Sequence, residues 1–328
     1  NTANPTRVGS YYDLTTSAGF ETIGGATFSI ETMVDDSDGF ISRFPTVAID
    51  PYGNPLVAYM RLNAGFKDPR YVVVKSKDLG ETFTSDAVVN NFSGGLVSDC
   101  CPATVIESGN ATVIVYRDNL SDVRNVWAGI STNMGNSFRK GMQLDTTNWS
   151  SKTCPAHPPH GIIISDTLYS VYSSGAGDSM LVYLSKASLH GLAAVSYPLT
   201  GNFVGLTSQN FPRIANSGNA AAIVWEQSLG INNEICMLFT NEITNGFPAL
   251  HDVMKVGSPA NADVALADAQ RAGADRLGRQ PRLGALHPVA AQAVEVVLVG
   301  LGLALHAGTG GGGGGDGHIG KGLVAEEV

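Results

Sequence analysis

Short runs of alternating apolar and polar residues recur along the first 257 residues, and each run ends in a turn-forming segment. In NATVIVYR (110–117), Thr112, Ile114 and Tyr116 would share one face of a strand, and the residues between them the other. Ser, Thr, Asn, Gly and Val dominate this part of the chain and favour strands and turns over helices. The pattern predicts an all-β protein.

The strands group into four units of similar length. Each first strand is expected to begin at a proline, and these prolines lie 57, 57 and 53 residues apart: Pro45, Pro102, Pro159 and Pro212. Each second strand carries one aromatic residue: Tyr59, Tyr116, Tyr172 and Trp225. Each third strand leads into a polar turn that begins at Ser76, Ser131, Ser185 or Thr240, and a weaker fourth strand follows. A unit of four antiparallel strands at this period is typical of a β-propeller blade. A β-sandwich would not repeat its turns so regularly, and a β-helix repeat would be shorter.

The two ends of the chain depart from the repeat. Residues 1–40 are expected to supply part of another blade, with TFSIETMVDD (27–36) as an outer strand. We therefore predict a propeller domain over 1–257. Residues 258–328 are rich in Ala and Gly and lack aromatic residues. ANADVALADA (260–269) could start a fifth blade, but no later pattern completes one. The segment 258–328 is expected to be an irregular tail, either disordered or read in a different frame.

Composition narrows the class of protein. The net charge of −9, from 20 basic and 29 acidic residues, argues against general binding of nucleic acid. The longest apolar run, 289–308, is interrupted by Glu295 and His306, so we expect no membrane span. Four cysteines are too few for a disulfide scaffold, although Cys154 could form one bridge, to Cys100 or to Cys101. The first residue is Asn1, so a removed leader and a secreted or periplasmic location are expected.

Two of the polar turns share a pattern of Ser, an acidic or amide residue, Gly, a hydroxyl residue and an aromatic. The pattern consists of Ser76, Asp78, Gly80, Thr82 and Phe83 in the first unit, and of Ser131, Asn133, Gly135, Ser137 and Phe138 in the second. An Asp side chain can accept backbone N–H bonds, Gly tolerates positive φ, and the aromatic can pack under the sheet. These residues are expected to be structural.

This pattern resembles the Asp-box of the sialidase superfamily, whose members are six-bladed propellers. SRFPTVAIDPYGNPLVAYMR (42–61) is also similar to the sialidase segment that carries a carboxylate-binding arginine, which implies that role for Arg43. The resemblance implies that Asp68 is the acid/base, because it is the only acid between Arg61 and Arg70. Glu226 is then a candidate helper of a tyrosine nucleophile, whose position no motif indicates. A six-bladed ring would be incomplete here, and a closed ring of four blades is the alternative.

Antiparallel blades place their connections on two faces, and the Asp-box turns lie on the face away from the other candidates. Arg61, Arg117, Asp118 and Arg124 are expected to bind substrate at the mouth of the ring. The alternative for Arg117 and Arg124 is that they form ion pairs between loops with Asp118 and Asp122. Further polar residues are expected on this face: Arg70, Asp99, Cys100, Cys101, Asp122, Cys154, His157, His160, Asp178 and Glu234. Arg213 begins the fourth unit without a clear partner.

The expected function is therefore a sialidase-like glycoside hydrolase that acts on acidic glycans or glycoconjugates. Its activity would be lost if residues of the later blades are missing. The alternative is a non-catalytic Asp-box propeller that binds glycans or protein partners. No cofactor and no metal are expected. A Zn²⁺ site built from Cys154, His157 and His160 with Cys100 or Cys101 is the weaker alternative to a disulfide.

Overall fold

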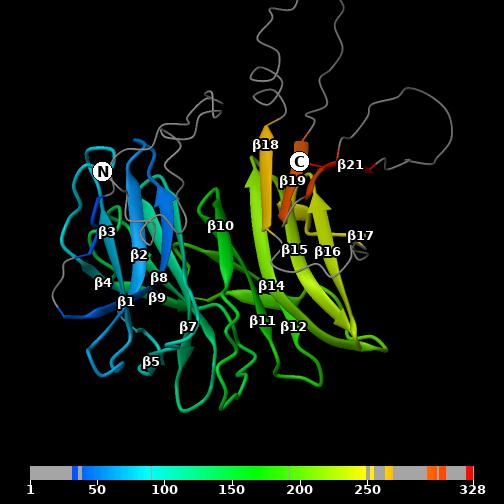
Figure 1. Cartoon of the computed structure of the whole chain (residues 1–328), viewed down its shortest axis with the longest axis horizontal. Coiled ribbons are helices and arrows are strands. Elements are labelled where there is room, and N and C mark those ends of the chain that lie inside the picture. Colours follow the sequence, from blue (N-terminus) through cyan, green and yellow to red (C-terminus); the bar gives the residue numbers. More distant parts are fainter. Residues whose placement is uncertain are drawn as a thin grey trace, which may run out of the picture.

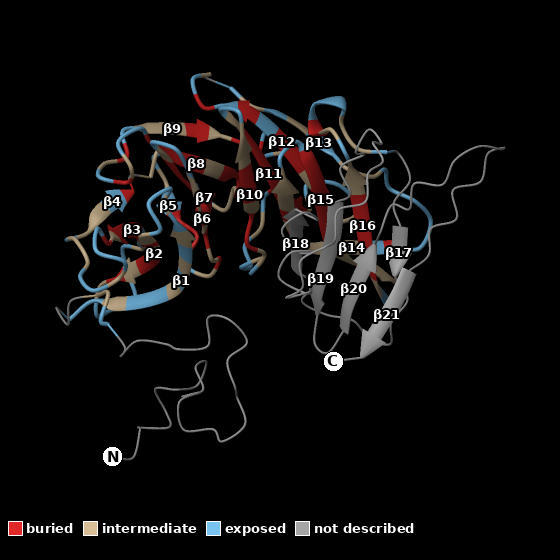
Figure 2. Ribbon diagram, turned by 90° about the horizontal axis from the view of Figure 1, so that it is seen from above, coloured by how far each residue is buried: buried red, intermediate tan, exposed pale blue. Residues whose placement is uncertain are grey.

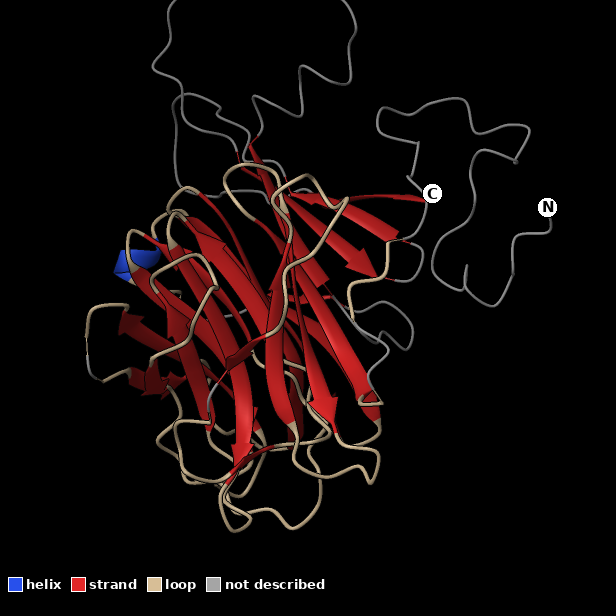
Figure 3. Ribbon diagram, turned by 90° about the vertical axis from the view of Figure 1, so that its left-hand side faces the viewer, coloured by secondary structure: helices blue, strands red, loops and turns tan. Residues whose placement is uncertain are grey.

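The structure is a computed structural model. It describes residues 32–35, 39–89, 91–191 and 193–248, and the backbone of strands between residues 252 and 327. The expected outer strand at 27–36 lies outside the described residues except for 32–35, which form no strand. Among these residues strands account for nearly all regular structure, and one short 3-10 helix, Ile243–Asn245, lies between the third and fourth strands of the fourth unit (Figure 3). The described residues are therefore all-β, as predicted.

Each predicted repeat forms one antiparallel sheet, which we call blades one to four (Figure 1). Blade one contains β1 (Ile41–Ile49), β2 (Pro55–Leu62), β3 (Arg70–Lys75) and β4 (Ala87–Val89). Blade two contains β5 (Leu96–Val97), β6 (Thr104–Ser108), β7 (Ala111–Asn119), β8 (Val126–Ser131) and β9 (Lys140–Gln143). Blade three contains β10 (His160–Ile164), β11 (Thr167–Ser174), β12 (Leu181–Ser188) and β13 (Val195–Pro198). Blade four contains β14 (Leu206–Ser217), β15 (Ala220–Leu229), β16 (Asn232–Thr240) and β17 (Asp252–Met254).

The blades are arranged around their first strands. β6 contacts both β1 and β10, and β10 contacts β14, so the first strands follow one another in sequence order. Seen from above, the blades follow an arc, and buried residues concentrate in their second and third strands (Figure 2). This arrangement confirms the predicted β-propeller architecture.

The first strands differ in one respect from the prediction. β1 and β14 begin before their prolines, and the register of each shifts at Phe44-Pro45 and Phe211-Pro212. Both phenylalanines have positive φ, 55° and 50°. Proline cannot donate a ladder hydrogen bond, so the strand accommodates it in a bulge and continues on the other side. In blade two the same region, 98–103, interrupts the strand entirely and leaves β5 and β6 as separate partners of β7.

The aromatic of each second strand packs in the core. Tyr116 lies between blades one and two, with its ring 6.0 Å from that of Tyr71. Tyr172 packs with residues of blade two, and Trp225 packs with residues of blade three. Tyr59, Tyr116, Tyr172 and Trp225 are all at most 3% exposed. Tyr116, Tyr172 and Trp225 therefore join blades two, three and four to the preceding blade, whereas Tyr59 packs with Val72 and Val74 of its own blade.

The Asp-box of blade one has the expected hydrogen bonds. Asp78 accepts from the Thr82 backbone N–H (2.9 Å), the Thr82 hydroxyl (2.6 Å) and the Ser76 hydroxyl (2.7 Å). These bonds lower the pKa of Asp78 to about 2. Gly80 has φ 99°, and Phe83 packs against a buried cluster on blade one.

The second Asp-box repeats this geometry with an amide. Asn133 accepts from the Ser131 hydroxyl (2.7 Å) and the Ser137 backbone N–H (3.0 Å). Gly135 has φ 75°, and Phe138 is 2% exposed in the core between blades one and two. Both boxes therefore form a turn held by the same side-chain hydrogen bonds, with the aromatic packed in a buried cluster.

The described residues of the C-terminal segment are the backbones of four strands. β18 (Asp263–Asp268), β19 (Val294–Gly300), β20 (Leu303–Ala307) and β21 (Leu323–Glu327) form a fifth four-stranded antiparallel sheet. β18 contacts β14, so this sheet follows blade four in the same order as the other blades. ANADVALADA therefore does start a sheet. The sequence pattern missed its partners because they lie 26 or more residues further along a Gly- and Ala-rich chain.

Candidate functional site

The first strands of the four blades line an open cavity of about 570 Å³. Most of the lining residues are apolar, among them Val47 and Ile49 of β1, which are 61% and 58% exposed. A small set of polar side chains interrupts the apolar wall: Thr46, Thr104, Glu107, His160, Arg213 and Asn216. Ligand sites in proteins combine such a concave apolar surface with a few polar groups. This central cavity is the candidate binding site.

His160 and Arg213 lie next to each other on the cavity wall. His160 begins β10, and its Nδ1 accepts the backbone N–H of Ile214 at 3.3 Å, the residue after Arg213. The Phe211-Pro212 bulge immediately precedes Arg213 and sets the start of this stretch of β14. An arginine and a histidine together form a site suited to an anionic or polyhydroxylated ligand.

Glu107 is the one carboxylate among the described residues that line the cavity. Burial raises its pKa to about 7, although the Thr112 hydroxyl donates to both of its oxygens (2.8 and 2.9 Å). Glu107 is the last residue but one of β6 and lies near Lys75 and Asp50, on the side of the Asp-box turns. Glu107 was not among the predicted site residues, because a glutamate next to a turn is an ordinary strand ending.

We expect Glu107→Gln to weaken the dependence of stability on pH. The pKa of Glu107 is higher in the folded than in the unfolded chain, so its favourable contribution is complete below about pH 4.5 and is lost as pH rises through about 7. The carboxyl is only half-buried, so the wild type should lose about 1 kcal/mol between pH 5 and pH 8 that the variant retains. Urea unfolding at both pH values measures this difference.

The matched control is Glu81→Gln, which makes the same change on an exposed Asp-box turn. Equal pH dependence in wild type and Glu107→Gln would show that the carboxyl titrates as it does in water.

A second cluster of polar side chains, Arg117, Asp118 and Asp145, lies between blades two and three. Arg117 is wholly buried and donates to the backbone carbonyls of Arg124 and Ser173, each at 2.7 Å. Its guanidinium also lies 5.3 Å from the Trp149 ring. Burial lowers the pKa of Arg117, and the nearby Asp145 carboxyl raises it. These contacts connect the end of β7 to the next blade.

Asp118 and Asp145 are the acids beside this arginine. Asp118 is 2% exposed and Asp145 0%, and burial raises the pKa of both carboxyls. One oxygen of each carboxyl is buried and has no hydrogen-bond partner. Arg124 donates from Nη1 to the Ser98 hydroxyl (2.8 Å) and from Nε to the Ser151 carbonyl (3.2 Å). The predicted ion pairs between loops are therefore replaced, for both arginines, by bonds to carbonyl and hydroxyl groups.

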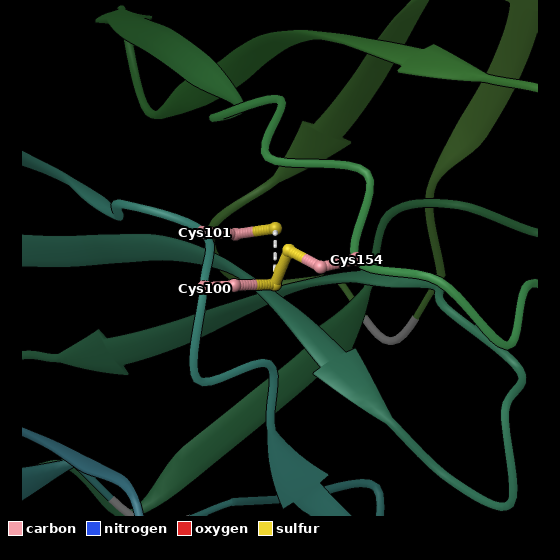
Figure 4. A group of neighbouring side chains, drawn as sticks. All are labelled: Cys100, Cys101 and Cys154. Atoms are coloured by element: carbon pink, nitrogen blue, oxygen red, sulfur yellow. Dashed lines mark hydrogen bonds between the residues drawn. A yellow bond between two sulfur atoms is a disulfide. The ribbon is translucent and has the colours of Figure 1, made fainter.

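A disulfide connects two loops near Arg117, Asp118 and Asp145. It joins Cys100 to Cys154, with Cα atoms 6.2 Å apart, and so decides between the two pairings that the sequence left open. Cys101 is a free buried cysteine beside it (Figure 4). His157, three residues after Cys154, is half-buried against Phe211, and burial lowers its pKa to about 4. The bridge therefore connects the 98–103 interruption of blade two to the segment that enters blade three.

The candidates in blade one lie at the same end of the sheet without contacting one another. Arg43 is exposed, and its guanidinium lies 4.6 Å from the Phe44 ring. Asp68 is exposed in the loop between β2 and β3 and accepts from the Asn63 amide at 3.1 Å. Arg61 forms an ion pair with Asp86, at the start of the outermost strand, and lies over the Phe40 ring. The ion pair directs Arg61 across its own blade.

Glu226 follows the aromatic of blade four, as Arg117 follows that of blade two. It is half-buried on β15, opposite Asn210 of β14 and Ile235 of β16. Catalytic roles for Glu226 and Asp68 remain predictions.

Comparisons with known proteins show similarity of fold. No family model matches the chain, and no curated protein matches it. Among solved structures, the GH93 α-L-arabinofuranosidase of Fusarium graminearum, in complex with arabinobiose, is similar with a TM-score of 0.55 and 11% identity. That alignment covers 85% of this chain and 91% of that one.

Two further structures agree. The Penicillium chrysogenum α-L-arabinanase, complexed with arabinobiose, has a TM-score of 0.55 and 10% identity over 81% of this chain and 77% of that one. A protein of unknown function from Dyadobacter fermentans has a TM-score of 0.51 and 13% identity over 82% and 79%. The chain therefore has a β-propeller fold similar to that of glycoside hydrolases.

No helix among the described residues is long and apolar enough to cross a membrane.

Proposed function

We propose that the protein binds an acidic glycan, of the sialic-acid type, in the central cavity. The observation that carries this proposal is the position of Arg213 beside His160 among the residues that line the cavity. A guanidinium can form two parallel hydrogen bonds to a carboxylate, which a neutral sugar lacks. The cavity size falls in the range of small-ligand sites.

We propose Arg213 as the first anion contact because it is the one arginine among the described residues that line the cavity. Arg43 is exposed at the start of β1 and is a second candidate for the same ligand, whereas Arg61 is engaged by Asp86. Arg117 and Arg124 are buried and bond to backbone or hydroxyl oxygens. Their contribution to binding would be to hold the loops around the cavity.

Arg213→Ala tests the proposal. A charge-assisted hydrogen bond contributes about 1.5–3 kcal/mol, so the variant should bind a sialylated oligosaccharide about 10- to 100-fold more weakly in calorimetric titration. Arg139→Ala removes the same charge from an exposed residue in the Asp-box connection of blade two and should leave the affinity unchanged. Equal affinities for wild type and Arg213→Ala, or no preference for sialylated over neutral oligosaccharide, would overturn the proposal.

Hydrolysis of the bound glycan is the second candidate function, supported by the fold shared with glycoside hydrolases. In this proposal Asp68 is the acid/base, and Glu226 assists a nucleophile. Release of 4-methylumbelliferone from its sialic-acid glycoside, abolished in Asp68→Asn, would support it. Binding without turnover would leave a non-catalytic glycan-binding propeller.

We also infer a secreted or periplasmic location. The Cys100–Cys154 disulfide supports it, because such bridges persist in oxidising compartments. Retention of the bridge in protein isolated under alkylating conditions from its native compartment would test this inference, and finding only free thiols would contradict it.

A further inference from the structure

Three sulfur atoms meet between blades two and three, which is one more than a disulfide needs. The Sγ atoms of Cys100, Cys101 and Cys154 all lie within 4.8 Å of one another, and those of Cys100 and Cys101 are 3.8 Å apart. Figure 4 shows the three side chains pointing toward a common point from two separate loops. The disulfide accounts for the positions of the Cys100 and Cys154 sulfurs but not for that of the neighbouring Cys101 sulfur.

We propose that, once the Cys100–Cys154 disulfide is reduced, Cys100, Cys101 and Cys154 form a binding site for one zinc-type metal ion. Three thiolates and one water complete the four ligands that Zn²⁺ prefers. This inference concerns the cysteine cluster alone and does not depend on glycan binding in the cavity.

The spacing of the sulfurs fits such an ion. With Zn–S bonds of about 2.3 Å, tetrahedral geometry places two thiolate sulfurs about 3.8 Å apart. The Cys100 and Cys101 sulfurs already have this separation. Cys154 is exposed, so after reduction a rotation of its side chain can move its sulfur to the third position. The exposed side of Cys154 also gives an ion a path to the cluster.

The surroundings favour thiolates. The Ala156 backbone N–H donates to Cys154 Sγ at 3.3 Å, and the Ser98 hydroxyl lies 3.5 Å from Cys100 Sγ. The buried guanidinium of Arg117 interacts electrostatically with Cys101. Three thiolates and a divalent cation carry one net negative charge, which the nearby guanidinium balances.

The chemistry balances in two steps. A phosphine reductant supplies two electrons and takes the oxygen of one water molecule to become the phosphine oxide, and the two protons of that water complete the Cys100 and Cys154 thiols. A dithiol supplies both the two electrons and the two protons and becomes a disulfide itself. Binding of the ion then releases three protons, one from each thiol. The oxidised protein cannot bind in this way, because its two bridged sulfurs are not thiolates. Binding is therefore controlled by the redox state.

The experiment compares the reduced and the oxidised full-length chain. The protein is reduced with a phosphine, freed of reductant under anaerobic conditions, and titrated with Cd²⁺, whose thiolate complexes absorb in the ultraviolet. Competition with Zn²⁺ against a chelating dye follows. Reduced wild type should bind one ion per chain, and oxidised wild type should bind none at the cluster.

Cys101→Ser is the decisive variant because it removes one sulfur and leaves the disulfide pair intact. Its affinity for Cd²⁺ after reduction should fall at least about tenfold. Cys236→Ala, which removes a buried cysteine in blade four, is the matched control and should bind as wild type does. Correct folding of both variants is checked in the oxidised state, where the disulfide is present. No Cd²⁺ binding by reduced wild type, or equal binding by Cys101→Ser, would overturn the proposal.

Discussion

Replacing Arg117 by Met should lower the free energy of unfolding by about 3–5 kcal/mol, the largest effect we expect from a single substitution. Met preserves much of the volume but removes the donors to the Arg124 and Ser173 carbonyls. It also leaves the buried acids Asp118 and Asp145 without a neighbouring positive charge. Buried polar groups that lose their partners are costly because water cannot replace them.

Urea unfolding at neutral pH measures this loss. Arg139→Met makes the same substitution at an exposed position and should change stability by less than about 0.5 kcal/mol. Arg117→Lys retains the charge but cannot reach both carbonyls with one planar group, so an intermediate loss is expected. A loss below about 1 kcal/mol in Arg117→Met would show that the group is not a structural contact between blades.

Removing the disulfide should have the second-largest effect. The Cys100–Cys154 bridge closes a loop with a sequence separation of 54 residues. The chain-entropy account assigns such a loop about 4 kcal/mol, and native bridges commonly contribute about 2–4 kcal/mol. Cys154→Ser should therefore unfold at a distinctly lower urea concentration than oxidised wild type.

Reductant sensitivity provides the control for this prediction. Oxidised wild type should lose stability when a phosphine is added in the presence of a metal chelator, and Cys154→Ser should not change. The chelator keeps metal binding from offsetting the loss. If the variant were as sensitive to reductant as the wild type, the stabilising bridge would have to involve other cysteines.

Local patterns were sufficient to predict the strands and the Asp-boxes. A strand such as β7 can be recognised in the sequence because its successive side chains point to opposite faces of the sheet. The turn at Ser76 is recognisable because Asp78 and Gly80 meet geometric demands within a few residues of sequence. These requirements involve residues close together in the sequence, so they can be recognised without knowing which distant residues pack against them.

The contacts of individual side chains could not be predicted from the sequence. Arg43, Arg61 and Arg117 look alike in the sequence, yet one is exposed, one forms an ion pair with Asp86 and one is wholly buried. Each outcome depends on which residue of a distant strand or a neighbouring blade arrives beside it. Glu107 was not predicted for the same reason, because its position lines a cavity only when the first strands of the four blades come together.

The sequence by itself determined the all-β class, the period of the blades, the recurring aromatic of each second strand, and the two Asp-box turns. These features arise from contacts within one unit or from a residue that recurs in every unit. The tertiary structure decided that Cys154 pairs with Cys100 rather than Cys101, that Arg213 and His160 share the cavity wall, and that residues 263–327 contain a fifth sheet. Those outcomes depend on separations of more than fifty residues or on strands joined across long connections, where packing, not local preference, selects the partner.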